Sequence, residues 1–384
     1  ASVNWLCRTD FNLLHIVLPL GISFFTFQQI SFLVDAYRGE VPRCGFLLYA
    51  SYVCYFPQLI AGPIVTHDEL IPQFMDTGKK RLDWENLAKG IYIFTLGLSK
   101  KVLLADVFGR AVDWGFAHYD DIHSELAFFV MLAYTFQIYF DFSGYCDMAA
   151  GIAKMMNIDL PVNFNSPYKA LTITEFWDRW HCTLTRFLKK YVYIPLGGNR
   201  KGELQTYLNI LIVFFISGFW HGAGLNFIVW GFCHGVFVIL TRRYKSFFEK
   251  LHPVLSYLMT FVFLTVTWVF FRAESFAQAA KILRRVAVFH FQELPDEFIN
   301  CFQMPGFAFL VKNSRAVFNL SPFYSVLIPV YFVLAVLIVL GTRNVQERAE
   351  RFAPTKTRLC AVVVLLLLCL NCFSAISPFL YFNF

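Results

Sequence analysis

Hydrophobic residues are grouped along this chain in long uncharged runs, which predict helices that cross a membrane. A helix needs about 20 apolar residues to cross the hydrocarbon core of a bilayer. Runs of at least that length, free of Asp, Glu, Lys and Arg, occur at residues 11–34, 44–67, 204–241, 251–271, 316–342 and 359–384. Residues 87–109 and 126–153 show the same pattern with a few embedded charges. Since residues 204–241 have room for two passes joined by a tight turn, the pattern predicts about eight or nine spans.

The composition supports a membrane protein and argues against most other classes. Hydrophobic residues make up 57% of the 384 residues, and charged residues only 15%, whereas about a quarter of a soluble domain is charged. The net charge of +7 is expected in the cytoplasmic loops of a membrane protein and gives no reason to expect nucleic acid. Membrane lipids are therefore the expected surroundings, and most cysteines, lying in apolar runs, are expected to behave as small hydrophobic groups.

Basic clusters predict the orientation of the chain. Residues 186–201, 242–250 and 343–358 are rich in Lys and Arg, and an even number of passes separates them, so the positive-inside rule places all of them in the cytoplasm. Residues 272–315 then fall outside, where an amphipathic segment would lie along the interface or pack on the bundle. No internal repeat, linker or soluble domain is visible, so residues 1–384 are predicted to form a single all-α polytopic membrane domain.

A histidine stands in the middle of the longest uncharged run. It belongs to the sequence Phe219-Trp220-His221-Gly222-Ala223-Gly224-Leu225-Asn226. The chain must turn or unwind there, and irregular backbone at membrane depth is tolerated only where it lines protein or a cavity. Because an ionisable group at that depth is costly and commonly functional, we predict a catalytic role for His221. His234 is better explained as a core histidine bonded to its neighbours.

A second candidate histidine lies within residues 166–201. Thr172 and Glu175 have the spacing of a capping box, which predicts a helix that begins near residue 173. Its apolar stripe comprises Trp177, Trp180, His181, Leu184, Phe187, Leu188 and Tyr191, and most charged residues fall off this stripe. We therefore predict an amphipathic helix on the cytoplasmic side, followed by a Pro/Gly turn, with His181 on the buried face.

Two aspartates and one interrupted segment are also unusual for membrane helices. Asp141 and Asp147 lie about 240° apart around the predicted helix. We favour a structural role, in which one of them pairs with Arg179 or Lys154, over a catalytic one. Two prolines and a glycine within residues 55–63 predict a broken helix, and broken helices commonly line binding sites.

The residue types narrow the chemistry without selecting one reaction. The chain contains no H-E-x-x-H, G-x-S-x-G or Walker sequence, and neither a metal site nor a bound cofactor is predicted. A neutral imidazole is suited to removing a proton from a hydroxyl near neutral pH. Transfer of an acyl group to that hydroxyl would also need donors for the developing oxyanion, such as the amide of Gly222 or Gly224, Asn226, or the second histidine.

Several short stretches carry a resemblance to known proteins. They are residues 18–29, 56–64, 139–145, Phe176-Trp177-Asp178-Arg179-Trp180-His181, residues 193–200, Phe219-Trp220-His221-Gly222 and the ending 377–382. In content and order they resemble the membrane-bound O-acyltransferase family, and most closely its bacterial alginate O-acetylase type. Members of that family usually begin with further hydrophobic helices, so we expect the N-terminal helices of the family to be missing here.

The resemblance implies a fold and a set of roles. The family fold is a ring of tilted helices around a central funnel with both histidines at its neck. His221 would act as general base or otherwise activate the acceptor, and His181 would orient or stabilise the reacting groups. The neighbouring residues predicted to bind substrate are Trp220, Gly222, Asn226, Asp178 and Arg179.

The resemblance also implies substrates and partners. The protein would move an acetyl group from acetyl-CoA or an acylated carrier across the bacterial inner membrane, and periplasmic partner proteins would complete its transfer to an exported polysaccharide such as alginate. Peptidoglycan or another glycan, or D-alanyl transfer to teichoic acid, are alternatives, although the turn at residues 194–200 favours the alginate type over the latter. A transporter, or a non-catalytic scaffold of an acetylation complex, would also carry polar residues at membrane depth.

Overall fold

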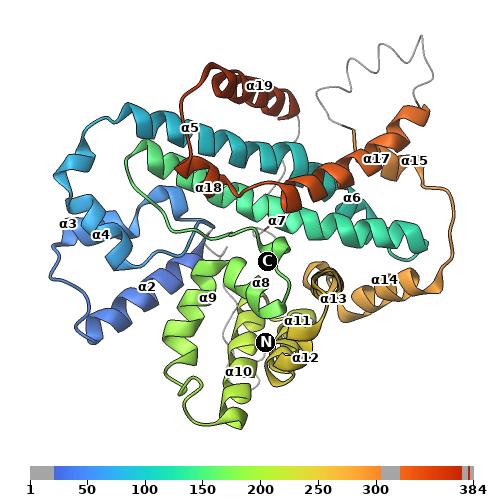
Figure 1. The fold of residues 1–384 in the computed structure, drawn as a ribbon, viewed down its shortest axis with the longest axis horizontal. Coiled ribbons are helices and arrows are strands. Elements are labelled where there is room, and N and C mark those ends of the chain that lie inside the picture. Colours follow the sequence, from blue (N-terminus) through green and yellow to red (C-terminus); the bar gives the residue numbers. More distant parts are fainter. Residues whose placement is uncertain (1–20, 304–320, 374–378, 381–384) are drawn as a thin grey trace, which may run out of the picture.

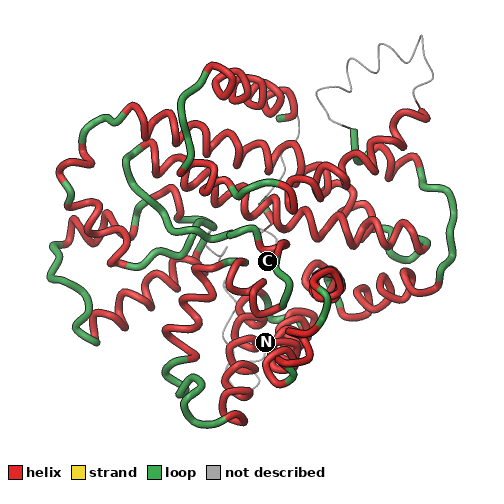
Figure 2. The backbone as a smooth tube through the Cα atoms, in the orientation of Figure 1, coloured by secondary structure: helices red, strands yellow, loops and turns green. Residues whose placement is uncertain are grey.

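The computed structural model describes residues 21–303, 321–373 and 379–380, and these residues form an assembly of helices (Figure 1). Figure 2 shows that helices and connecting loops account for this part of the chain, in which an isolated antiparallel bridge joins Phe164 and Trp180. The predicted all-α class is therefore confirmed.

The helices differ widely in length. The longer ones are α2 (Ile22–Tyr37), α5 (Trp84–Ser99), α7 (Ser124–Met155), α10 (Glu203–His221), α11 (Leu225–Arg243), α13 (Pro253–Arg272), α17 (Ser321–Val336) and α19 (Lys356–Cys372). The shorter ones are α3 (Phe46–Val53), α4 (His67–Met75), α6 (Asp106–Ala117), α8 (Ile173–Arg179), α9 (Cys182–Leu188), α12 (Lys245–Lys250), α14 (Phe276–Val288), α15 (Asp296–Asn300) and α18 (Val345–Glu350). Short 3₁₀ segments are η1 (Phe56–Gln58), η2 (Thr77–Lys80) and η4 (Pro167–Lys169). Segments of π-helix are η3 (Lys100–Ala105), η5 (Lys189–Tyr193) and η6 (Leu337–Gly341).

A long helical hairpin runs through the molecule. One arm consists of α5, η3 and α6, and the other is α7, which lies antiparallel to it (Figure 1). The arms meet closely at glycines: a Cβ added at Gly97 would lie 2.6 Å from the carbonyl oxygen of Gly144, and one at Gly90 would lie 2.6 Å from that of Gly151. Because small residues let membrane helices approach backbone to backbone, these glycines fix the register of the hairpin.

Two ion pairs are buried in this hairpin. Lys100 Nζ lies 2.6 Å from Asp147 Oδ2, and Lys101 Nζ lies 2.6 Å from Asp141 Oδ1. Each aspartate inside the apolar arm α7 therefore meets a lysine from the other arm. This confirms the structural role expected for the aspartates, since a buried charge persists in such surroundings only when it is paired.

The partners expected for the aspartates were wrong. Arg179 pairs instead with Glu175, one helical turn earlier in α8, at 2.9 Å. Lys154 pairs with Asp159, just beyond the end of α7, at 2.7 Å. Both basic residues find a carboxylate close to them in sequence, because residues four apart on a helix lie side by side and a short loop returns on itself.

The predicted double pass forms a second hairpin. α10 and α11 lie antiparallel, with residues 222–224 as the turn between them. A Cβ at Gly218 would lie 2.5 Å from the carbonyl oxygen of Phe227, and one at Gly231 would lie 2.4 Å from that of Phe214. α13 packs against both α11 and α7, so it connects the two hairpins. The prediction of two passes and a tight turn is confirmed.

Within the described ranges, four helices are long and apolar enough to cross a membrane: α7, α10, α11 and α13. Other predicted spans are represented by the shorter helices α2, α5, α17 and α19. Parts of the predicted windows, at residues 11–20, 316–320, 374–378 and 381–384, lie outside the described residues.

The single span expected at residues 44–67 is wrong. α3 ends at Val53, and η1 and irregular backbone lead to α4. Pro57 and Pro63 lack the N–H that a continuous helix requires, so the break expected within residues 55–63 is confirmed. The amphipathic segment expected after residue 272 is α14, which packs on α7 and α13 through Ala279 and Ile282.

Candidate functional site

His181 lies at a break between two short helices. α8 begins where it was expected, and the Glu175 N–H donates to Thr172 Oγ1 at 3.2 Å. The continuous amphipathic helix predicted to follow is wrong, because Trp180 is extended and His181 has φ 46° and ψ 51°, in the left-handed region. His181 nevertheless lies on the buried side, as the apolar stripe indicated.

The break is held in place by an earlier segment of the chain. The Cys182 N–H donates to the carbonyl oxygen of Asn163 at 3.0 Å, and the Asn165 N–H donates to that of Arg179 at 2.9 Å. These bonds on both sides of His181 replace those that a continuous helix would make. A left-handed conformation costs an L-residue about 1–2 kcal/mol, and such strained residues are concentrated at functional sites.

Asn163 also holds one ring nitrogen of His181. Nδ1 of His181 lies 3.0 Å from Asn163 Oδ1, and Thr183 donates to the same oxygen from its backbone N–H and its hydroxyl. Since a backbone N–H can only donate, the shared atom is the amide oxygen, and Nδ1 carries the hydrogen. A neutral His181 therefore presents its lone pair at Nε2, which has no hydrogen-bond partner among the described residues.

Aromatic rings surround His181. Phe142 meets the imidazole edge-on with ring centroids 4.8 Å apart, and Phe24 and Phe164 stack on it at 6.2 and 6.4 Å. Burial disfavours the imidazolium ion, and the nearby His221 adds to this effect, so the pKa of His181 lies well below its ordinary value of 6.5. The imidazole is therefore neutral at physiological pH.

His221 ends α10 and is enclosed by a second group of aromatic rings. Trp230 and Phe271 lie edge-on to it, with ring centroids 5.4 and 4.9 Å away. The chain turns away directly after the histidine. Gly222 makes this turn possible, because a Cβ at this position would lie only 2.4 Å from the ring of Phe227.

Phe24 and Trp220 connect the surroundings of the two histidines. The ring of Phe24 stacks on His181 and also lies edge-on to Trp220, the residue before His221, at a centroid distance of 5.7 Å. The structure thus brings together both predicted catalytic histidines and Trp220. We call the cluster formed by Phe24, Phe142, Phe164, His181, Trp220, His221, Trp230 and Phe271 the histidine cluster.

The other predicted site residues have different contacts. Asn226 Nδ2 donates to the carbonyl oxygens of Phe270 and Ala273 at 3.2 and 2.7 Å, and so binds the C-terminal end of α13. Asp178 is exposed, and Arg179 belongs to the ion pair within α8. Substrate binding by these three residues stays a prediction. In the described part of the chain, no group of three His, Cys, Asp or Glu side chains could hold a metal ion.

His234 is a core histidine, as expected. The Trp177 Nε1–H donates to its Nδ1 at 3.3 Å, and its Nε2 lies 3.1 Å from Thr267 Oγ1. The Thr267 hydroxyl donates to a carbonyl of its own helix. Its oxygen therefore accepts from His234 Nε2–H, and both ring nitrogens have a partner.

The role of Asn163 at this site is not evident from the sequence. Asn163 lies between Pro161 and Pro167, where the two prolines signal irregular backbone. A polar residue in such a segment is a candidate for holding a neighbouring side chain. The sequence does not predict that Asn163 contacts His181. The two residues are separated by α8, so they do not belong to one helix whose periodicity would place them side by side.

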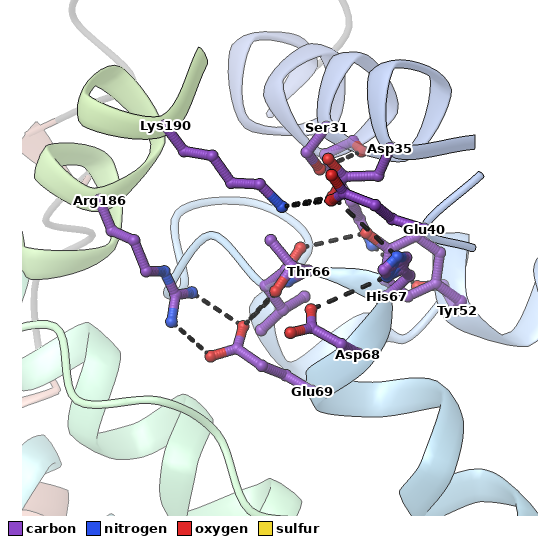
Figure 3. A network of polar contacts seen from close by, with 12 residues as sticks. Ser31, Asp35, Glu40, Tyr52, Thr66, His67, Asp68, Glu69, Arg186 and Lys190 are labelled. Atoms are coloured by element: carbon purple, nitrogen blue, oxygen red, sulfur yellow. Dashed lines mark hydrogen bonds and ion pairs between the residues drawn. The ribbon is translucent and has the colours of Figure 1, made fainter. Parts of the chain in front are cut away.

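A polar network fixes the chain after His181 to the N-terminal helices (Figure 3). Arg186 of α9 forms a bidentate pair with Glu69 of α4, with N–O distances of 2.6 and 2.8 Å. Lys190 of η5 reaches the buried carboxylate of Asp35 in α2 at 2.9 Å. Because charge-assisted bidentate bonds are directional, this network holds α9, and with it the position of His181, against α2 and α4.

Comparison with known proteins gives a consistent family. Residues 40–277 match the family model described as the membrane-bound O-acyltransferase family. A peptidoglycan O-acetyltransferase from Helicobacter pylori is 45% identical over 334 residues, which cover 78% of this chain and 63% of that protein. A probable alginate O-acetylase, AlgI, from Pseudomonas putida is 38% identical over 321 residues, covering 82% of this chain and 65% of that protein.

A more distant similarity is found to a teichoic acid D-alanyltransferase from Lacticaseibacillus rhamnosus. It is 26% identical over 246 residues, covering 60% of each chain. All three matches span less than two thirds of the relatives' own lengths. The matched family segment includes both histidines of the histidine cluster and Asn163.

Proposed function

Because this chain belongs to the membrane-bound O-acyltransferase family, we propose that it moves an acetyl group across the bacterial inner membrane for O-acetylation of an exported glycan. The family and the apolar helices make it a multi-pass membrane protein. Acetyl-CoA or an acylated carrier is the proposed cytosolic donor. The observation that carries the proposal is the histidine cluster, in which two buried imidazoles lie together and one of them presents a lone pair.

The proposed chemistry uses the two histidines differently. A hydroxyl oxygen of the acceptor attacks the carbonyl carbon of the donor. His221 takes the hydroxyl proton as the new carbon–oxygen bond forms, and returns it to the leaving group as the old bond breaks. His181 accepts a hydrogen bond at Nε2 and orients the hydroxyl. Neutral His181 has no hydrogen at Nε2 to donate to an oxyanion. Its single ring hydrogen is on Nδ1, which donates it to Asn163 Oδ1.

The relatives suggest an order in which acceptors are to be tested. The relative with 45% identity is named for peptidoglycan, and the one with 38% identity for alginate. Peptidoglycan is therefore the first acceptor to test and alginate the second. D-alanyl transfer follows, at 26% identity. Periplasmic partner proteins are proposed to complete the transfer to the glycan.

The test is the replacement of His221 by alanine in cells that depend on this protein. We expect the O-acetyl content of the glycan, measured by mass spectrometry of its fragments, to fall on the order of 10²–10⁴-fold relative to wild type. His118→Ala serves as the matched control, because His118 is exposed and bonds only within its own helix turn. Wild-type acetylation with inserted His221→Ala protein would contradict the proposed role.

Two other functions give different results in related experiments. A scaffold of an acetylation complex would retain acetylation when both His181 and His221 are replaced. A transporter would show flux of a solute in proteoliposomes that contain no acyl donor. Loss of acetylation in the double variant, without such flux, would support the enzyme over both.

A further inference from the structure

A cavity of about 640 Å³, whose lining includes no residue of the histidine cluster, lies between the central hairpin and the C-terminal helices. Its walls come mainly from α5, η3, α7, α17, η6, α18 and α19. In Figure 1, α17 and α18 lie beside the α5–α7 hairpin and α19 lies beyond it, above α5. A volume of this size is within the range of sites that bind small organic ligands, and most of the surface that lines it is apolar.

One end of the cavity is positively charged. Arg343 and Arg348 line it together with Thr342 and Asn344. Neither arginine side chain makes an ion pair or a hydrogen bond with another residue in the described part of the chain, and Lys169 adds a further charge where it donates to the Thr342 carbonyl at 2.7 Å. Two guanidinium groups without a carboxylate suit a phosphate, which arginine binds in a bidentate manner.

The body of the cavity is apolar and long. Leu327, Leu334 and Ile338 line it along α17 and η6. Tyr331 and Arg343 both line the cavity, and a helical rise of about 1.5 Å per residue separates them by roughly 15–18 Å along the chain. This length suits an extended acyl chain far better than an acetyl group.

Tyr331 is a buried residue in the wall of this apolar body. Tyr331 is only 5% exposed, and its hydroxyl has no hydrogen-bond partner among the described residues. Because the hydroxyl is sealed from the cavity, Tyr331 contributes only apolar surface to its wall.

We propose that this cavity binds an anionic glycerophospholipid, with its phosphate between Arg343 and Arg348 and an acyl chain running along α17 toward Tyr331. The two arginines belong to the basic cluster at residues 343–358, which the positive-inside rule assigns to the cytoplasmic side. Basic pockets between membrane helices on that side recognise anionic lipid headgroups. The lipid would tie the C-terminal helices to the central hairpin. This inference does not rest on the proposed acyl transfer.

The experiment uses the full chain in nanodiscs that contain equal amounts of phosphatidylglycerol and phosphatidylcholine. Native mass spectrometry after release should show phosphatidylglycerol retained on the wild-type protein. Arg343→Gln/Arg348→Gln should reduce the retained phosphatidylglycerol at least about fivefold, because the charge-assisted bonds of both guanidinium groups to the phosphate are lost. Equal retention of both lipids by the wild type, or unchanged retention in this variant, would overturn the proposal.

Arg242→Gln/Arg243→Gln is the matched control for charge. These arginines are exposed at the end of α11, on the same predicted side of the membrane, and do not line the cavity. The control should retain phosphatidylglycerol as the wild type does. An equal loss in both double variants would show general attraction to the surface and would also overturn the proposal.

A second variant tests the apolar part and does not depend on the arginines. Leu334→Trp places a large ring in the cavity, whereas Val333→Trp places the same ring at an exposed neighbouring position outside it. Only Leu334→Trp should lower phosphatidylglycerol retention. Addition of acetyl-CoA distinguishes a lipid site from a donor site: displacement of phosphatidylglycerol by acetyl-CoA would assign the cavity to the donor and overturn the lipid proposal.

Discussion

Two buried histidines, His181 and His234, show that equal burial can accompany different chemistry. Their side chains are 2% and 0% exposed, and aromatic rings surround both. At His234 both ring nitrogens have a partner, Trp177 for Nδ1 and Thr267 for Nε2. At His181 only Nδ1 has a partner in the described part of the chain, Asn163.

The two rings are consequently held in opposite tautomers. The hydrogen is on Nε2 of His234 and on Nδ1 of His181, since each partner determines which nitrogen donates. The backbone differs as well: His234 lies within α11, whereas His181 has a left-handed conformation between helices. Burial alone therefore does not separate a histidine with two hydrogen-bonded ring nitrogens from one that keeps a lone pair without a partner. Hydrogen bonding at both nitrogens and the backbone conformation do.

The largest expected effect is on acyl transfer, from replacing His181. His181→Ala removes the lone pair that orients the acceptor, so we expect O-acetylation to fall about 10²-fold or more. The measurement is the acetyl content of the glycan, normalised to the amount of protein in the membrane. If His234→Ala, at the same protein level, loses as much acyl transfer as His181→Ala, the proposed functional difference between the two histidines is contradicted.

The next largest effect is on stability, from replacing His234. His234→Ala leaves a cavity and deprives Trp177 and Thr267 of their partner, so the free energy of unfolding should fall by roughly 2–4 kcal/mol. The measurement is unfolding in mixed micelles, followed by tryptophan fluorescence. A smaller loss from His234→Ala than from His181→Ala would mean that the two nitrogens of His234 contribute little to holding α11 and α13 together.

Much of the fold follows from hydropathy, and its exceptions have local causes. The two passes of residues 203–243 are predictable because the uncharged run exceeds one span and its centre holds Gly222 and Gly224. Residues 44–67 are equally apolar, but the prolines remove helical hydrogen bonds, so length and hydropathy overstate the helix there. The partners of buried charges, such as Lys100 for Asp147, depend on how two helices pack that are distant in sequence. The spacing of residues along the chain therefore does not predict them.

The site was partly predictable for a similar reason. His221 and His181 stand out because imidazoles are rare in apolar sequence. The left-handed backbone at His181 was not predictable, because periodicity favoured one continuous helix. The continuous helix is interrupted because backbone groups on both sides of His181 form hydrogen bonds with the segment around Asn163 instead. These bonds are tertiary contacts. The same contact sets the tautomer of His181, so the chemical difference between His181 and His234 appears only in the folded structure.

A smaller effect on transfer is expected from removing the acceptor that fixes the tautomer of His181. Asn163→Leu should lower O-acetylation about 10- to 100-fold, in line with other hydrogen-bond partners that orient a functional histidine. Nitrogen-15 NMR of histidine-labelled protein should show His181 shifting from the Nδ1–H form toward a mixture, with His234 unchanged. An unaltered His181 signal in the variant would show that Asn163 does not set the tautomer.

Asn163→Asp tests, through the pH dependence of transfer, whether His181 is neutral in the reaction. Because burial and His221 keep the pKa of His181 well below 6.5, the wild-type protein should retain transfer as the pH falls below that value. A carboxylate beside Nδ1 favours the imidazolium form and raises the pKa. The acid limb of transfer, which reports loss of the neutral form, should therefore move to higher pH in Asn163→Asp. A shift to lower pH, or none, would contradict a neutral His181 in the reaction.

The smallest effect isolates one hydrogen bond of His234. Thr267→Val removes the oxygen that accepts from Nε2–H, whereas Thr265→Val, on the same helix, removes only a bond to the Phe261 carbonyl. Both threonines are buried, so the two substitutions are matched in size and surroundings. Thr267→Val should lower the free energy of unfolding by about 1 kcal/mol more than Thr265→Val, because it alone leaves a buried donor without a partner. Since neither threonine lies in the histidine cluster, transfer per folded molecule should be the same in both. If Thr267→Val and Thr265→Val lower stability equally, the hydrogen bond between His234 Nε2 and Thr267 contributes nothing to stability. His234 and His181 would then differ only in their backbone conformation.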